Sequence, residues 1–173
     1  MRLFFAIHFS DKTRERLFSA ANELCAQGQG KISPAENLHL TLVFLGETER
    51  VDAAISALTA VNSPAFSLRF ARIGQFGDLY WAGISSNDTL SLLQAQLTDR
   101  LRAAGFSPEN REFLPHTTLL RRFTPNRDFS PTAAETILAT IEESVSEIAL
   151  MASYPCGDHM RYETLAIRKL NQN

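Results

Sequence analysis

The chain has 173 residues, 45% hydrophobic and 21% charged, a composition typical of a soluble globular protein of one domain or two small lobes. Its 17 basic and 19 acidic residues give a net charge of −2, which argues against a protein that coats long nucleic acids but allows recognition of a nucleic acid end. The apolar runs are too short for a membrane span, and the N-terminus lacks a signal-peptide cleavage site. We therefore expect a cytoplasmic protein without membrane contact, whose two cysteines, Cys25 and Cys156, are reduced thiols.

Hydrophobic periodicity predicts alternating strands and helices along the chain. Period-two runs of β-forming residues predict strands over residues 2–9, 38–45, 66–76, 79–84, 116–123, 145–153 and 162–170. Helical spacing of apolar residues predicts helices over about 12–27, 49–61, 88–104 and 133–140. Gly28 and Gly30 are expected to end the first helix, and a loop is expected over 31–37. The strands 66–76 and 79–84 are expected to form one hairpin, and the strands 145–153 and 162–170 another. These two hairpins favour an α+β fold with antiparallel or mixed sheets and helices on the outer faces.

One short pattern occurs twice in these strands. Residues 39–42 are His-Leu-Thr-Leu, and residues 116–119 are His-Thr-Thr-Leu, so both copies have the form His-x-Thr-Leu. Side chains two apart in a strand point to the same face, so each copy places an imidazole beside a hydroxyl. In the first copy Leu40, Leu42 and Phe44 are expected on the opposite, apolar face. Two such polar faces across a cleft would converge on one small anion.

Two opposed histidines suit general acid–base catalysis on a phosphodiester. One neutral imidazole can take a proton from water while one protonated imidazole gives a proton to the leaving oxygen, because the unperturbed pKa of histidine is about 6.5. Thr41 and Thr118 would hold non-bridging oxygens, and a basic side chain beside the second motif would stabilise the transition state.

Two other interpretations of the histidines stay open at this point. A single His-x-Thr in a strand is usually structural. The second copy makes a functional interpretation about as strong as the structural one. A metal site is disfavoured because no carboxylate lies within two residues of His39 or His116 and threonine is a poor ligand. His8 and His159 have no threonine two residues on, and we expect both to be structural or surface residues.

The paired motifs resemble those of the 2H phosphoesterase superfamily, and more closely its bacterial and archaeal RNA 2′,3′-cyclic phosphodiesterases, first described as 2′-5′ RNA ligases. The similarity extends over nearly the whole chain and rests on the opening strand 2–7, the blocks 36–46 and 115–121, Gly157 and Tyr162. It implies one domain, residues 1–173, with a two-lobed, pseudo-symmetric α+β fold, antiparallel or mixed sheets lining a central cleft, and no metal or cofactor. It also implies hydrolysis of RNA 2′,3′-cyclic phosphate ends to 2′-phosphates.

The resemblance assigns roles to individual residues. His39 would protonate the departing O3′, His116 would activate water, and Thr41 and Thr118 would bind phosphate oxygens. Arg121 matches the family's basic position in the second motif. In a regular strand, however, Arg122 shares the face of His116 and Thr118, so either a β-bulge or the strand end re-aims Arg121, or Arg122 does its work.

Each aromatic residue near the motifs has two interpretations, a base-stacking side chain or part of the core. Phe4 would face the same cleft if its strand neighbours the first motif strand, where it could stack on a base or simply belong to the core. Trp81 and Tyr162 carry the same two interpretations.

Three functions follow in order of preference. The first is metal-independent hydrolysis of cyclic phosphate ends of RNA or of small cyclic nucleotides by a monomer. The second is the related 2′-5′ RNA ligase or 2′-5′ phosphodiesterase reaction, which would use the same residues. The third is a non-catalytic module that binds nucleotides or RNA ends. Both motifs are complete, which speaks against the third.

Overall fold

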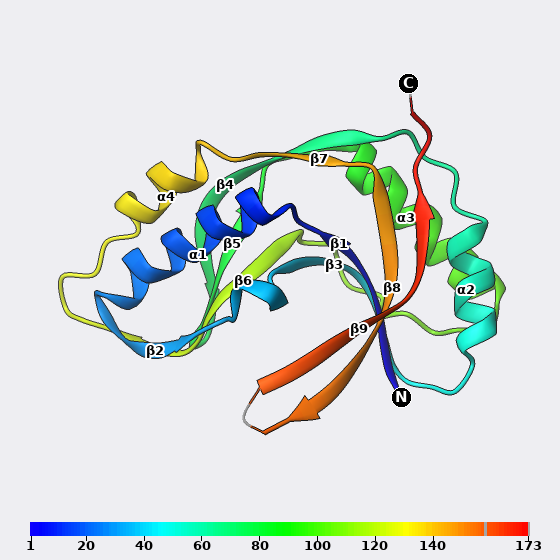
Figure 1. Ribbon diagram of the computed structural model, residues 1–173, viewed down its shortest axis with the longest axis horizontal. Helices are drawn as coiled ribbons and strands as arrows, with labels where there is room; N and C mark the ends of the chain where they lie inside the picture. Colours follow the sequence, from blue (N-terminus) through cyan, green and yellow to red (C-terminus); the bar gives the residue numbers. More distant parts are fainter. Residues whose placement is uncertain (158, 173) are drawn as a thin grey trace.

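Two antiparallel sheets form the centre of the molecule, with helices on their outer sides (Figure 1). The computed structural model describes residues 1–157 and 159–172. The first sheet has the order β3-β1-β8-β9, with bounds β3 His39–Glu47, β1 Arg2–His8, β8 Glu147–Cys156 and β9 His159–Lys169. The second has the order β2-β6-β5-β4-β7, with bounds β2 Gly28–Ile32, β6 His116–Pro125, β5 Leu79–Ile84, β4 Phe66–Phe76 and β7 Glu142–Val145.

The four α-helices of the described chain divide between the two sheets. Helices α1 (Asp11–Cys25) and α4 (Thr132–Leu138) pack on the five-stranded sheet, and α2 (Val51–Thr59) and α3 (Asp88–Ala103) pack on the four-stranded sheet. The two longest helices begin at capping side chains, because Ser10 accepts a hydrogen bond from the Thr13 amide and Asn87 accepts one from the Leu90 amide. None of the described helices is long and apolar enough to cross a membrane.

The sheet topology repeats itself. Strands β3, β1 and β8 lie side by side in one sheet, and β6, β5 and β4 lie in the same order in the other. We call β3, β1 and β8 the first unit and β6, β5 and β4 the second. In the first unit the motif strand β3 pairs with β1, which leads into α1, and in the second the motif strand β6 pairs with β5, which leads into α3. One large cluster of buried apolar side chains draws on both units. The expected α+β class and the two pseudo-symmetric lobes are confirmed.

The structure differs from expectation at two strands. Residues 28–32 form strand β2 on β6, although two glycines in five residues give this segment little β propensity. The glycines are there because the chain passes close to β6: a Cβ on Gly30 would lie 2.8 Å from the Cα of Phe123. The expected strand 145–153 corresponds to β8, which begins at Glu147, whereas Val145 is the last residue of β7, a short strand of the other sheet that was not predicted.

Candidate active site

The two motif strands lie next to each other although they belong to different sheets. Strands β3 and β6 contact one another near the centre of the molecule (Figure 1). In the first unit His39 lies opposite His8 on β1, and in the second His116 lies opposite Gly83 on β5. The structure thus brings the two His-x-Thr motifs together from positions 77 residues apart (116 minus 39).

Each motif strand carries a β-bulge directly after its threonine. The pairing register skips Leu42 in β3 and Leu119 in β6, and both leucines are buried together with the residue that follows them. A bulge shifts the alternation of side chains by one residue. The next residues, Phe44 and Arg121, therefore emerge on the histidine side of their strands.

The bulge explains which arginine faces the site. Burial lowers the pKa of His39 and raises the pKa of Tyr162, and the charge of Arg121 acts on both groups in the lowering direction, which places its guanidinium near the first motif. The neighbouring Arg122 has a left-handed backbone, with φ of 52°. Regular alternation would have selected Arg122, and the extra residue in β6 reverses that choice.

Backbone carbonyls fix the same tautomer in both histidines. Nδ1 of His39 lies 2.7 Å from the carbonyl oxygen of Asn37, and Nδ1 of His116 lies 2.7 Å from that of Leu114. A carbonyl can only accept, so Nδ1 carries the proton in each ring and Nε2 is the free position of the neutral form. In His39 the Thr41 hydroxyl lies 3.1 Å from Nε2 and donates to it.

Aromatic rings flank both imidazoles. Phe4 and Tyr162 each lie 5.1 Å from His39 between ring centroids, and Phe76 and Trp81 lie 5.3 and 5.5 Å from His116. Burial among these groups lowers the pKa of His39 to about 4, an effect to which the charges of His8 and Arg121 add. His39 is consequently neutral at pH 7 when the site is empty.

The structure does not fit a base-stacking role for Phe4. Its side chain is 2% exposed and is covered by His39, Phe44 and Tyr162. No open face is left for a nucleobase, so Phe4 packs and orients His39. The exposed aromatic ring on this side is Phe44, which is 55% exposed. Regular alternation predicts it on the apolar face, and the bulge at Leu42 moves it to the other face.

Trp81 and Phe76 are site neighbours that the motifs did not reveal. Trp81 is buried against His116, and Gly74 makes room for it, since a Cβ there would lie 2.1 Å from the indole. Phe76 contacts the Trp81 ring at a tilt and the His116 ring edge to face, and it remains 49% exposed. Their position at the β4–β5 hairpin was predicted, but their contact with His116 depends on the pairing of β5 with β6.

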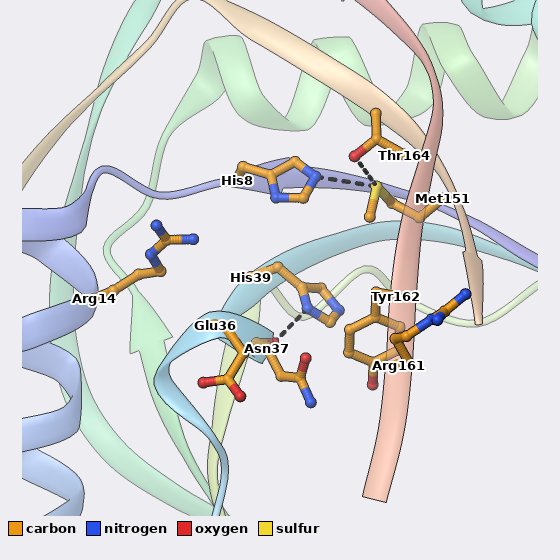
Figure 2. A pocket seen from close by; sticks show the side chains of 9 residues that line it. All are labelled: His8, Arg14, Glu36, Asn37, His39, Met151, Arg161, Tyr162 and Thr164. Atoms are coloured by element: carbon orange, nitrogen blue, oxygen red, sulfur yellow. Dashed lines mark hydrogen bonds between the residues drawn. The ribbon is translucent and has the colours of Figure 1, made fainter. Parts of the chain in front are cut away.

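A cavity of about 240 Å³ opens beside His39 (Figure 2). Its walls come from β1, α1, the short 3₁₀ turn Ala35–Asn37, β3, β8 and β9. The lining residues are His8, Arg14, Glu36, Asn37, His39, Met151, Arg161, Tyr162 and Thr164. His8, expected to be structural or at the surface, has its Nε2 3.0 Å from Met151 Sδ and shares this cavity with His39. Within the described chain no group of three His, Cys, Asp or Glu side chains is arranged to hold a metal ion.

Thr117 offers a test of the packing behind the second motif. Its hydroxyl is buried, has no hydrogen-bond partner among the described residues, and occupies the position that Leu40 has in the first motif. We expect Thr117→Val to raise the free energy of unfolding by about 1 kcal/mol, because it removes an unsatisfied polar atom at constant shape. Urea unfolding measures this change, and a loss of stability would show that the hydroxyl has a partner.

Sequence comparison agrees with this geometry. The profile of the 2′-5′ RNA ligase superfamily matches residues 10–154, which include both motifs. The chain belongs to the 2′-5′ RNA ligase superfamily. Among its relatives, an RNA 2′,3′-cyclic phosphodiesterase of Escherichia coli is 31% identical over 176 residues, covering 99% of this chain and 97% of that protein.

Other members of the superfamily give a consistent result. An RNA 2′,3′-cyclic phosphodiesterase of Geobacillus stearothermophilus is 32% identical over 146 residues, which are 76% of this chain but only 45% of that protein. The chain thus spans less than half of that relative. The crystal structure of E. coli LigT in apo form has a TM-score of 0.83 and 29% identity, with 99% of this chain and 98% of that chain covered. This likeness supports the two-lobed fold over the full length.

Proposed function

We propose that the protein hydrolyses the 2′,3′-cyclic phosphate end of RNA to a 2′-phosphate, as a monomer without metal or cofactor. The observation that carries the proposal is that His39 and His116 make the same hydrogen bond and therefore have the same tautomer. Both Nδ1 atoms are held by a backbone carbonyl two residues earlier, which leaves both Nε2 atoms for the substrate. Such a pair can work as one base and one acid.

The proposed reaction balances with these two groups alone. Nε2 of His116 takes a proton from water while the water oxygen attacks phosphorus. The P–O3′ bond breaks, and O3′ receives a proton from Nε2 of His39, leaving the phosphate on O2′. The two imidazoles have then exchanged protonation states, and exchange with solvent resets them. Arg121 offsets the charge that develops on the phosphate oxygens.

Because the pKa of His39 is low in the empty site, His39 can act as the acid only when the bound substrate raises that pKa. Two unit charges about 4 Å apart interact by about 4 kcal/mol at an effective dielectric constant of about 20, which corresponds to roughly 3 pKa units. A bound cyclic phosphate anion therefore raises the pKa of His39 toward neutrality and recruits its proton. Once Nε2 is protonated it no longer accepts from Thr41, whose hydroxyl is then free to bind a phosphate oxygen.

The relatives support the same chemistry. The E. coli and Geobacillus stearothermophilus proteins are named RNA 2′,3′-cyclic phosphodiesterases. Crystal structures of E. coli LigT have been solved in complex with 3′-AMP and with phosphate. We infer that Thr41, Thr118 and Arg121 bind the reacting phosphate in this chain.

Turnover of a defined RNA tests the proposal. An oligoribonucleotide ending in a 2′,3′-cyclic phosphate is incubated with the protein and excess EDTA, and the ends are resolved chromatographically. We expect conversion to the 2′-phosphate at an undiminished rate. A second reaction contains RNA with a 5′-hydroxyl, so that a 2′-5′ linked product would reveal ligation. Binding of 2′-AMP without any turnover would overturn the catalytic proposal and leave a nucleotide-binding module.

Arg121 and Arg122 form a matched pair for testing the phosphate contact. We expect Arg121→Gln to lower kcat/KM about tenfold to a hundredfold, since a charge-assisted hydrogen bond contributes about 1.5–3 kcal/mol. Arg122→Gln removes the same charge one residue away, and we expect a change below about twofold. Steady-state rates of both variants on one cyclic-phosphate substrate decide the matter. A larger loss in Arg122→Gln would reverse the assignment.

A further inference from the structure

The proposed reaction determines the direction from which RNA enters the site. In an in-line displacement the attacking water and the departing O3′ lie on opposite sides of phosphorus. With water at His116 and O3′ at His39, the terminal ribose lies on the His39 side. The remainder of the RNA is attached to that ribose through its 5′ oxygen, so the chain must leave past His39.

The cavity lies where this path leads. It shares His39 with the proposed site and extends past it along the first sheet, toward His8, Met151 and Thr164 (Figure 2). The second unit differs here, because the residue opposite its histidine is Gly83 where the first unit has His8. The two halves of the site thus differ at two corresponding positions. Phe44 follows the bulge in β3 where Arg121 follows it in β6, and His8 lies opposite the first histidine where Gly83 lies opposite the second.

Two arginines reach this cavity from opposite elements. Arg14 comes from α1 and Arg161 from β9, and in Figure 2 they stand on opposite sides of the lining residues, with the guanidinium of Arg161 directed away from His39, so that it has to turn toward the cavity to contact an anion there. Arg14 contacts Asp11, whose side chain is 86% exposed, and Arg161 lies 5.9 Å from the ring of Tyr154. Contacts of this kind at the surface are weak because water screens them, so both guanidinium groups retain the capacity to bind an anion.

We propose that this cavity binds the phosphate group on the 5′ side of the terminal nucleotide, through Arg14 and Arg161. The inference rests on the proposed function and adds to it a substrate class: RNA ends of two or more nucleotides, in preference to a nucleoside cyclic phosphate. The carboxylate of Glu36, on the 3₁₀ turn, faces the same cavity and weakens the attraction for an anion.

Two substrates that differ by one nucleotide test the subsite. The first is adenosine 2′,3′-cyclic phosphate, and the second is the same nucleoside cyclic phosphate extended at its 5′ oxygen by adenylyl. We expect kcat/KM of the wild type to favour the dinucleotide about tenfold or more. Arg14→Gln and Arg161→Gln are each expected to remove most of that preference and to change the rate on the mononucleotide less than about twofold.

Neutralising the acidic side chain in the cavity tests the subsite with a change of opposite sign. Glu36→Gln removes a negative charge and is expected to raise the preference for the dinucleotide, opposite to the arginine variants. Arg100→Gln, on the exposed surface of α3, is the matched control and is expected to change neither substrate. A purely structural role of the arginines would lower both substrates together.

Three outcomes would overturn the subsite: no preference in the wild type, equal losses on both substrates in the arginine variants, or a loss in Glu36→Gln. If the wild type turns over neither substrate, the proposed function has failed. The subsite is then decided by calorimetric titration of the 2′-phosphorylated dinucleotide against 2′-AMP. Weaker dinucleotide binding in the arginine variants, with 2′-AMP unchanged, supports it, and equal affinities throughout overturn it.

Discussion

Replacing His39 or His116 with alanine is expected to lower kcat on a cyclic-phosphate RNA by at least about a hundredfold each. The two imidazoles act in the same step, one accepting and one donating a proton. The double variant should therefore be little slower than the slower single variant, because groups that act as a unit are not additive. Steady-state kinetics with a labelled RNA end measure all three rates.

His159→Ala is the control for this experiment. His159 is exposed at the start of β9 and has no proposed part in the reaction. We expect its rate to match the wild type, and thermal unfolding should show that all variants are folded. A histidine variant that is folded and retains full activity would remove that residue from the mechanism.

Lowering the pH from about 7 to 4 is expected to destabilise the protein through His39. Burial lowers the pKa of His39 to about 4, whereas in the unfolded chain it is about 6.5. Between these values the unfolded state binds a proton that the folded state excludes, so stability falls as the pH falls through this window. The difference of about 2.5 units corresponds to at most about 3 kcal/mol.

Urea unfolding at pH 7 and pH 4.5 measures this loss in the wild type and in His39→Gln. Carboxylates titrate in the same range in both proteins, so the difference between the two pH dependences isolates His39. Burial also lowers the pKa of His8, which adds a contribution of the same sign that persists in the variant. Identical pH dependence in the two proteins would show that His39 is not the buried neutral imidazole described above.

The sequence predicted the parts of the site that follow from strand alternation. His39 and Thr41 share a face, and His116 and Thr118 share a face, because strand alternation places residues two apart on one side. The meeting of the two strands was expected from the family resemblance, and the structure shows that contact. The sequence also predicted the α+β class and the positions of the long helices within a few residues.

The bulges after the threonines could not be predicted in the same way. In both strands the extra residue is leucine and the next residue is valine or leucine, so apolar residues on either face would look alike. The error moved Phe44 to the wrong face and left Arg121 and Arg122 undecided. Two adjacent apolar residues inside an alternating strand are the signal that was available.

Contacts between residues far apart in the sequence could not be predicted either. Phe4 faces the predicted side, but Tyr162 on β9 closes over it, and no local pattern couples residues so far apart. Strand β2 was missed because its glycines serve the close approach to Phe123 on β6, a tertiary requirement that opposes their local propensity.

The position of bond cleavage tests the central proposal most directly. RNA ending in a 2′,3′-cyclic phosphate is hydrolysed in water enriched in oxygen-18, and the product is examined by phosphorus NMR and mass spectrometry. We predict a 2′-phosphate that carries one labelled oxygen, because water activated by His116 attacks phosphorus and His39 protonates O3′. A 3′-phosphate product, or a 2′-phosphate without label, would contradict this account.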